Sequence, residues 1–121
     1  MATIYIKNLR LRTIIGIEDG ERTHKQDIII NAQIEVNIDT PAQSDNINDA
    51  FNYKTITKKI IEFVESSDYF LLEKLVDQLL KLIMQDEQAI TTTVEVDKPA
   101  ALRFSDSVSI KQTATRKPNP G

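Results

Sequence analysis

The chain has 121 residues, a net charge of −3, no cysteine and a single histidine, His24. This length supports one domain with one core. The lack of cysteine excludes disulfides and thiolate metal sites. A single histidine provides too few imidazoles for a typical zinc site and makes a Ser-His-Asp triad a poor expectation. Because the basic residues are dispersed and no apolar run reaches membrane-spanning length, we expect a soluble, cytoplasmic protein without nucleic-acid or membrane partners.

Two strands are predicted at the start of the chain. Ile4 and Ile6 alternate with polar residues, and the apolar positions then switch parity to Leu9 and Leu11, which indicates a β-bulge. Residues 26–39 alternate more regularly, as expected of a long antiparallel strand with one buried face. The two strands are expected to pair as a hairpin whose longer loop contains Gly20 and its charged neighbours.

Two helices are predicted after a polar loop that contains Pro41. The first places Ile56, Ile60, Phe63 and Val64 at helical spacing, and residues 72–83 repeat the pattern with leucine, valine and isoleucine. The segment Ser66-Ser67-Asp68 separates the helices and offers an N-cap for the second one.

The chain then returns to strands at 91–98 and 102–111, which a tight Pro99-Ala100-Ala101 connection is expected to join. The order is ββααββ, so we expect an α+β fold with two helices on one face of an antiparallel sheet. Residues 1–112 are assigned to a single domain and 113–121 to a flexible tail, because the apolar periodicity ends there.

The other face of the predicted sheet is polar, and its long outer strands leave exposed edges. The polar face would carry Arg10, Arg12, Gln33, Glu35 and Glu95. Exposed strand edges are usually covered or paired in proteins. Oligomerisation through these edges is therefore expected.

Lys98 is the most unusual residue of the third predicted strand. Side chains alternate along a strand, so Lys98 shares the buried face with Val94 and Val96. An ammonium on an apolar face needs a partner or a cavity, and catalytic lysines are often placed in this way. The alternative is a strand-end lysine that extends its ammonium to water.

Glu21, Tyr53, Glu73 and Lys98 all lie at the ends of predicted elements, where functional sites are usually built. With the residues around them, they make the chain similar to the dihydroneopterin aldolase and dihydroneopterin triphosphate epimerase family over residues 3–111. The motifs that carry this resemblance are Ile15-Gly16-Ile17 with Glu21 and Gln26, the segment 45–53, Leu72-Glu73, and Lys98-Pro99. The segments 8–13, 52–53 and 101–109 resemble the epimerase branch more than the aldolase branch.

The resemblance implies the tunnelling fold, or T-fold, in which ββααββ subunits join edge to edge into a tetrameric barrel and two barrels stack as an octamer. It also implies active sites between neighbouring subunits, so that Tyr53 would come from a different chain than Glu73 and Lys98. The chemistry of this family needs neither a metal nor a cofactor.

Roles for single residues follow from the resemblance. Glu73, with Leu72 beside it, would bind the pterin, because one carboxylate can accept the two adjacent N–H groups of the ring edge. Lys98 and Tyr53 would move protons during the reaction, and Glu21 would position Lys98. Without the resemblance, the alternative for Glu73 is a solvent-facing glutamate that the helix N-terminus stabilises. The alternative for Tyr53 is a tyrosine of the core or of an interface.

A triphosphate tail on the substrate would need cations. Arg103, five residues after Lys98, is the first candidate, followed by Arg10, Arg12 and Lys111. For the pair Arg10 and Arg12, a solvated strand face is the alternative interpretation. His24 is expected to lie on a surface loop.

The leading functional hypothesis is a pterin 2′-epimerase that converts 7,8-dihydroneopterin triphosphate to 7,8-dihydromonapterin triphosphate by retro-aldol and aldol steps. The alternative enzyme is a dihydroneopterin aldolase, which yields 6-hydroxymethyl-7,8-dihydropterin and glycolaldehyde for folate synthesis. A hypothesis from another class is a non-catalytic pterin- or purine-binding module of the same fold.

Overall fold

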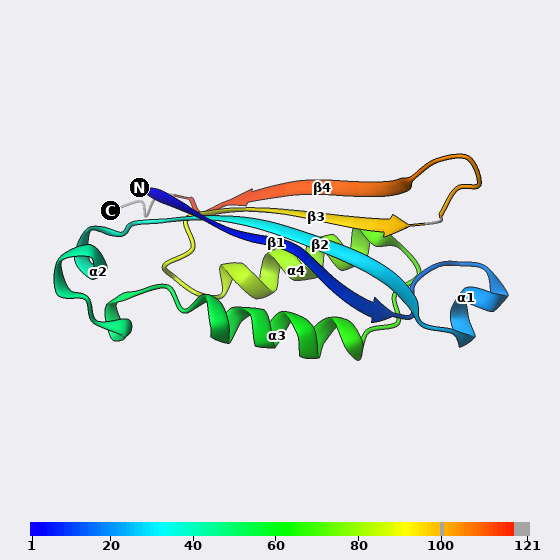
Figure 1. Cartoon of the computed structure of the whole chain (residues 1–121), viewed down its shortest axis with the longest axis horizontal. Coiled ribbons are helices and arrows are strands. Elements are labelled where there is room, and N and C mark those ends of the chain that lie inside the picture. The colour runs from blue at the N-terminus through cyan, green and yellow to red at the C-terminus, as the bar shows by residue number, and fades with distance from the viewer. Residues whose placement is uncertain (100, 118–121) are drawn as a thin grey trace.

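A four-stranded antiparallel sheet with two long helices on one face makes up the body of the molecule (Figure 1). The computed structural model describes residues 1–99 and 101–117. The strands are β1 (Ala2–Thr13), β2 (Gln26–Val36), β3 (Thr91–Pro99) and β4 (Ser107–Thr115), in the spatial order β1-β2-β3-β4. The long helices are α3 (Tyr53–Glu65) and α4 (Leu72–Met84). The predicted ββααββ order is therefore confirmed.

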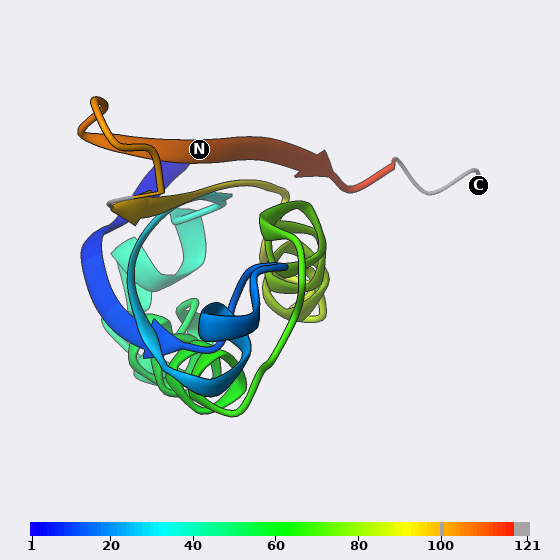
Figure 2. The same cartoon turned by 90° about the vertical axis from the view of Figure 1, so that its right-hand side faces the viewer.

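Three short helical segments lie in the connections, where the sequence predicted loops. They are α1 (Asp19–Thr23), α2 (Asp39–Ser44) and the 3₁₀ turn η1 (Ile47–Asp49). Seen from one end, the sheet curves around the two long helices (Figure 2). The core fills the space between the sheet and α3 and α4.

The hairpin of β1 and β2 contains the predicted bulge. Its register shifts between Ile6 and Leu9, and Asn8 adopts a left-handed backbone conformation with φ 52°. The Asn8 N–H donates a hydrogen bond of 2.8 Å to Oδ1 of Asn31 on the neighbouring strand. Asparagine tolerates this conformation better than most residues, so the bulge falls where the sequence allows it.

Strands and helices bury the apolar faces that their periodicities predicted. Along β2, every second residue from Ile28 to Val36 is buried. Helix α3 begins after Asn52, whose side chain accepts a hydrogen bond of 3.0 Å from the Thr55 N–H. It buries Ile56, Ile60 and Val64, while α4 buries six apolar residues between Leu72 and Ile83.

The fourth strand differs from its prediction. The expected strand 102–111 is confirmed only from Ser107, where pairing with β3 begins, and it continues to Thr115; the tight connection expected before it is wrong. Leu102 and Phe104, whose alternation suggested a strand, lie exposed in a longer loop, as does Asp106. Residues 113–115 belong to β4 rather than to the predicted tail, since backbone pairing needs no apolar side chains. Residues 118–121 of that tail lie outside the described residues.

The predicted N-cap of the second long helix is also wrong. Helix α4 begins at Leu72, with Leu71 at its N-cap position. The serines of the connection instead bond to the end of α3. The Ser66 hydroxyl donates to the Glu62 carbonyl at 2.9 Å, and the Ser67 hydroxyl donates to the Val64 carbonyl at 2.7 Å. They satisfy carbonyls that the end of a helix leaves without partners.

Within the described residues, no helix has the length and apolar character needed to cross a membrane.

Candidate active site

A cavity of about 240 Å³ opens where β1 and β3 end and α4 begins. It brings together four of the predicted site residues, Glu21, Leu72, Glu73 and Lys98. The remaining lining residues come from the stretches around these four and from the start of β4: Ile15, Gly16, Ile17, Phe70, Leu71, Ala101, Val108 and Ile110. The walls are thus mostly apolar, with one ammonium and two carboxylates.

Lys98 and Glu21 form an ion pair in this cavity. The Lys98 side chain is only 12% exposed and that of Glu21 is 23% exposed, so the pair is largely shielded from water. The hydrogen bond from Lys98 is the main reason why the pKa of Glu21 falls from 4.5 to about 2, against the opposing effect of burial. Lys98 therefore does not extend to water, and the partner that its apolar surroundings require is Glu21.

The loop from Ile15 to Gln26 holds the Glu21 carboxylate in place. The Gln26 amide donates hydrogen bonds to the Ile15 carbonyl at 2.6 Å and to Glu21 Oε2 at 3.1 Å. Gly16 has φ +126°, and a Cβ atom there would lie 2.3 Å from the Glu21 carboxyl group. Glycine is therefore required at position 16 both by the backbone conformation and by the close approach of Glu21.

Glu73 lies in the first turn of α4, on the cavity wall and exposed. Leu72 beside it is 8% exposed and belongs to the core, which anchors the start of the helix. The backbone N–H groups of a helix N-terminus stabilise a carboxylate in its ionised form. An ionised carboxylate can accept two parallel hydrogen bonds from adjacent N–H groups of a ligand.

Tyr53 lies elsewhere in the chain. It is the first residue of α3 and is 54% exposed on a surface shared with Lys54, Lys58 and Ile61. Among the described residues, it does not line the cavity that contains Lys98. Within this chain, Tyr53 therefore does not share a cavity with the ion pair.

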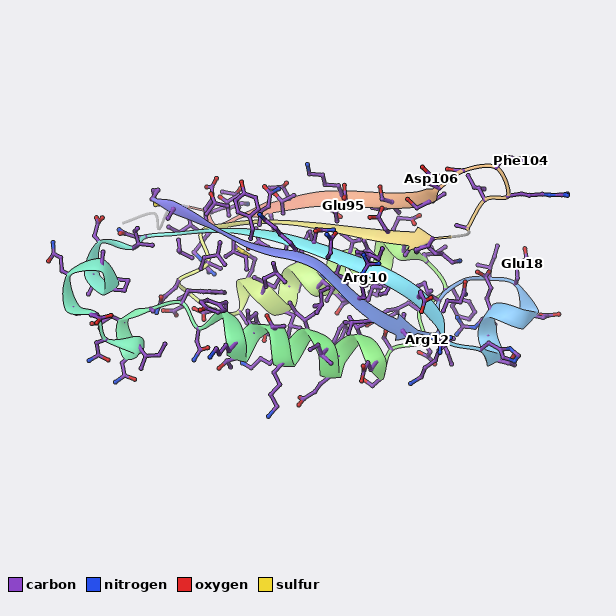
Figure 3. All side chains as sticks on the ribbon, viewed as in Figure 1. Arg10, Arg12, Glu18, Glu95, Phe104 and Asp106 are labelled. Carbon is purple, nitrogen blue, oxygen red and sulfur yellow. The ribbon has the colours of Figure 1, made fainter. Side chains whose placement is uncertain are left out.

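The predicted phosphate-binding cations also lie outside the cavity. Arg103 is exposed in the β3–β4 loop, with its guanidinium carbon 5.3 Å from the centre of the Phe104 ring. Arg10 and Arg12, which are labelled in Figure 3, line a separate hollow of about 350 Å³ beside the paired strands β1 and β2. There Arg12 pairs with Asp27 at 3.2 Å. His24 is exposed near Thr23, as expected for a surface loop.

Two residues at the cavity were not identified from the sequence. The Arg22 side chain donates hydrogen bonds to backbone carbonyls on both sides of the cavity, and Phe70 lies against it on the cavity wall. The available signals were weak: an arginine directly after Glu21, and an aromatic residue shortly before Glu73.

Comparison with known proteins assigns this chain to a family. The family model for dihydroneopterin aldolase matches residues 4–113. The chain belongs to the dihydroneopterin aldolase family. This member of the family is 48% identical over 109 residues to the dihydroneopterin triphosphate 2′-epimerase of Escherichia coli strain K12, covering 90% of this chain and 91% of that protein.

Further comparisons agree with that assignment. The dihydroneopterin triphosphate 2′-epimerase of Pseudomonas aeruginosa is 46% identical over 110 residues, which cover 91% of this chain and 89% of that protein. The crystal structure of E. coli dihydroneopterin aldolase in complex with neopterin superposes with a TM-score of 0.89 at 22% identity, covering 94% of this chain and 99% of that one. The expected T-fold of the subunit is thereby confirmed.

Proposed function

We propose that this protein is a pterin 2′-epimerase that converts 7,8-dihydroneopterin triphosphate to 7,8-dihydromonapterin triphosphate. The observation that carries this proposal is the shielded Lys98–Glu21 ion pair, which shares one cavity with the Glu73 carboxylate. The chain also matches the E. coli epimerase over 90% of its length at 48% identity. The site thus offers a carboxylate for binding a ring edge and, beside it, groups that can move protons.

Glu73 is assigned to recognition of the pterin. The 2-amino-4-oxo edge of the ring presents two adjacent N–H donors, and the two oxygens of one carboxylate can accept both. Apolar lining residues such as Leu72 and Ile17 suit the faces of a flat ring. This arrangement would leave the side chain of the substrate directed toward the ion pair.

The reaction needs proton transfers at two places. A base takes the proton of the 2′-hydroxyl, the C1′–C2′ bond breaks, and the bonding electrons move into the pterin ring, where N5 takes up a proton from an acid. The reverse steps form the same bond again on the opposite face of the aldehyde, which inverts C2′. We assign these transfers to Lys98 and Tyr53, and we assign to Glu21 the positioning of the Lys98 ammonium.

A complete site would then need a second subunit. Tyr53 is exposed and lies outside the cavity of its own chain, as a residue that completes a neighbour's site must. Strands β1 and β4 are the two edges of the sheet, and pairing of these edges would close a ring of subunits. We propose a homo-oligomer of four or eight chains with active sites between subunits.

Arg103 is proposed to hold the triphosphate. It lies in the exposed loop that follows Lys98 and Pro99, two residues after Ala101, which lines the cavity. Replacing Arg103 with alanine should raise KM for the triphosphate and leave KM for unphosphorylated dihydroneopterin unchanged. An unchanged KM for both substrates would show that Arg103 does not bind the tail.

Product analysis tests the proposed reaction. Purified protein is incubated with 7,8-dihydroneopterin or with its triphosphate, and the pterins are separated by chromatography after oxidation. Monapterin triphosphate as the main product, absent with a Lys98→Met variant, is the expected result. No turnover of either substrate would contradict the proposal and favour a pterin-binding module.

Aldolase activity is the second candidate, because the family model that matches residues 4–113 is that of dihydroneopterin aldolase. Both reactions share the cleavage of the C1′–C2′ bond, and release of the aldehyde fragment in place of its re-addition gives the aldolase products. Rapid formation of 6-hydroxymethylpterin from the unphosphorylated substrate would assign the protein to this activity.

A further inference from the structure

The side chain of Arg22 connects two segments that face each other across the candidate active site. Its Nη1 atom donates to the Gly16 carbonyl at 3.1 Å and to the Tyr69 carbonyl at 3.0 Å, and Nη2 donates to the Asp68 carbonyl at 2.5 Å. The Gly16 N–H donates to the same Tyr69 carbonyl at 3.3 Å. One guanidinium therefore ties the loop that carries Glu21 to the segment that leads into α4 and Glu73.

The same guanidinium lies against Phe70. Its central carbon is 4.0 Å from the centre of the Phe70 ring, which is the geometry of a close cation–π contact. The Phe70 side chain is nevertheless 60% exposed, and it lines the cavity that contains Lys98 and Glu73. One part of the ring is thus held by Arg22, and the rest offers an apolar surface to the cavity.

Phe70 does not pack into the hydrophobic core. The preceding residue, Tyr69, turns toward the protein and packs against Phe63 at a centroid distance of 6.2 Å, whereas Phe70 remains largely exposed. A large apolar side chain held in a fixed place without burial gains little stability for the fold. A flat ligand in the cavity would supply the contact that this ring lacks.

We propose that Phe70 is a stacking surface for the ring of the pterin substrate, and that Arg22 is the positioning residue that holds it there and keeps the Glu21 loop next to the start of α4. This inference rests on the proposed pterin-binding function. Glu73 would bind the edge of the ring and Phe70 would contact a face, so the two residues restrict the ligand in different directions. Aromatic rings favour such offset stacking.

Equilibrium binding of neopterin to the full chain tests the stacking role. Phe70→Leu keeps an apolar side chain but loses the aromatic face, so neopterin should bind roughly three- to tenfold more weakly. The matched control is Phe104→Leu, because Phe104 is 94% exposed at the tip of the β3–β4 loop and lies outside the cavity (Figure 3). That control should bind neopterin like the unmodified protein.

Steady-state kinetics separate the two roles. Phe70→Leu should raise KM and leave kcat near its original value, because stacking acts equally on bound substrate and transition state. Arg22→Ala should raise KM and also lower kcat, since the Glu21 loop loses its attachment. Arg22→Lys should not restore either value, because one ammonium cannot reproduce a planar group that bonds three carbonyls and lies on a ring. Lys25→Ala removes another cation from the same loop and is the control for loss of charge, so it should leave KM and kcat unchanged.

The outcomes distinguish this inference from the function on which it rests. Unmodified protein that binds neopterin, together with a Phe70→Leu variant that binds it equally well, would overturn the stacking role alone. Full rescue by Arg22→Lys would overturn the positioning role of the guanidinium. If the unmodified protein failed to bind any pterin while remaining folded, the proposed function and this inference would both be overturned.

Discussion

Lys98 and Glu73 lie in the same cavity but belong to different steps of the proposed reaction, and substitutions can separate them. Lys98→Met removes the ammonium and should lower kcat by roughly 10²- to 10⁴-fold, the usual range for a group that transfers protons, with little effect on neopterin binding. Glu73→Gln keeps the size of the side chain and removes its charge. Because charged acceptors form the stronger hydrogen bonds, it should weaken neopterin binding by about ten- to a hundredfold.

Paired measurements of kcat and of the neopterin dissociation constant check this separation. Glu87→Gln, which changes an exposed glutamate outside both the cavity with Lys98 and the surface around Tyr53, serves as the control and should leave both values unchanged. A Lys98→Met variant that retained its kcat would contradict the assignment of proton transfer to the ion pair.

The lowered pKa of Glu21 predicts how the free energy of unfolding depends on pH. Its pKa is about 2 in the folded protein against 4.5 normally, so the folded state binds this proton less readily than the unfolded chain does. The resulting stabilisation is fully present above about pH 5 and decreases as the pH falls toward 2. In Glu21→Gln this contribution is missing, so the difference in unfolding free energy between the two proteins should shrink as the solution is acidified.

Urea unfolding of both proteins at a series of pH values measures that difference. Asp19→Asn, which changes an exposed carboxylate of the same loop, should follow the unmodified protein throughout. A difference that stayed constant between about pH 6 and pH 3 would mean that the Lys98–Glu21 pair does not lower the pKa of Glu21.

At the scale of secondary-structure elements, Arg116 secures the end of β4 beside the end of α4. Its side chain donates to the carbonyls of Met84 at 2.6 Å, Asp86 at 3.1 Å and Ala89 at 3.2 Å, and its own N–H donates to the Ile90 carbonyl at 2.8 Å. The carbonyls at a helix end otherwise lack partners within the helix. A residue of the expected tail therefore completes the C-terminal end of α4.

Arg116→Ala should reduce the free energy of unfolding by about 0.5–1.5 kcal/mol, the usual net range for a hydrogen bond, because the Arg116 side chain is exposed. It should leave kcat unchanged, because the contacts lie away from the cavity with Lys98. Thermal or urea unfolding measures the effect, and Lys117→Ala is the matched control at the next position. Equal stability of the two variants would show that the contacts of Arg116 contribute nothing measurable.

At the scale of the whole molecule, Tyr53 does not line the cavity that contains the ion pair, which predicts that each site needs two chains. Tyr53→Phe and Lys98→Met should each be inactive alone, because every site would lack one group. When the two variants are unfolded and refolded together in equal amounts, random assembly should make about one quarter of the sites intact, since each site would draw the two residues from different chains of a symmetric oligomer.

Activity of the refolded mixture, compared with each variant refolded alone, checks this expectation. A mixture of Tyr53→Phe with Glu87→Gln, which keeps Lys98 in both chains, controls for losses during refolding. If the first mixture remained as inactive as its components while the control mixture was active, Tyr53 and Lys98 would have to act within one chain, or Tyr53 would have no role in the reaction.

The sequence by itself determined those features that depend on a repeating pattern. The two-residue period predicted strands over residues 26–39 and 91–98 and placed Val94, Val96 and Lys98 on one buried face, although the first of these strands ends at Val36. The parity switch before Leu9 marks the bulge. The helical period likewise identified the buried faces of α3 and α4. Such patterns can be read from a sequence because burial acts on the side chains themselves.

Only the tertiary structure decided the features that rest on backbone groups. Arg22 and Arg116 bond to carbonyls, which every residue has, so no residue type in the sequence marks their partners. The same reason explains β4, whose pairing through residues 113–115 follows from the exposed edge of β3 rather than from apolar side chains. That Tyr53 lies outside the cavity was expected only from the family resemblance, because no pattern of residue types shows how α3 and the sheet pack in three dimensions.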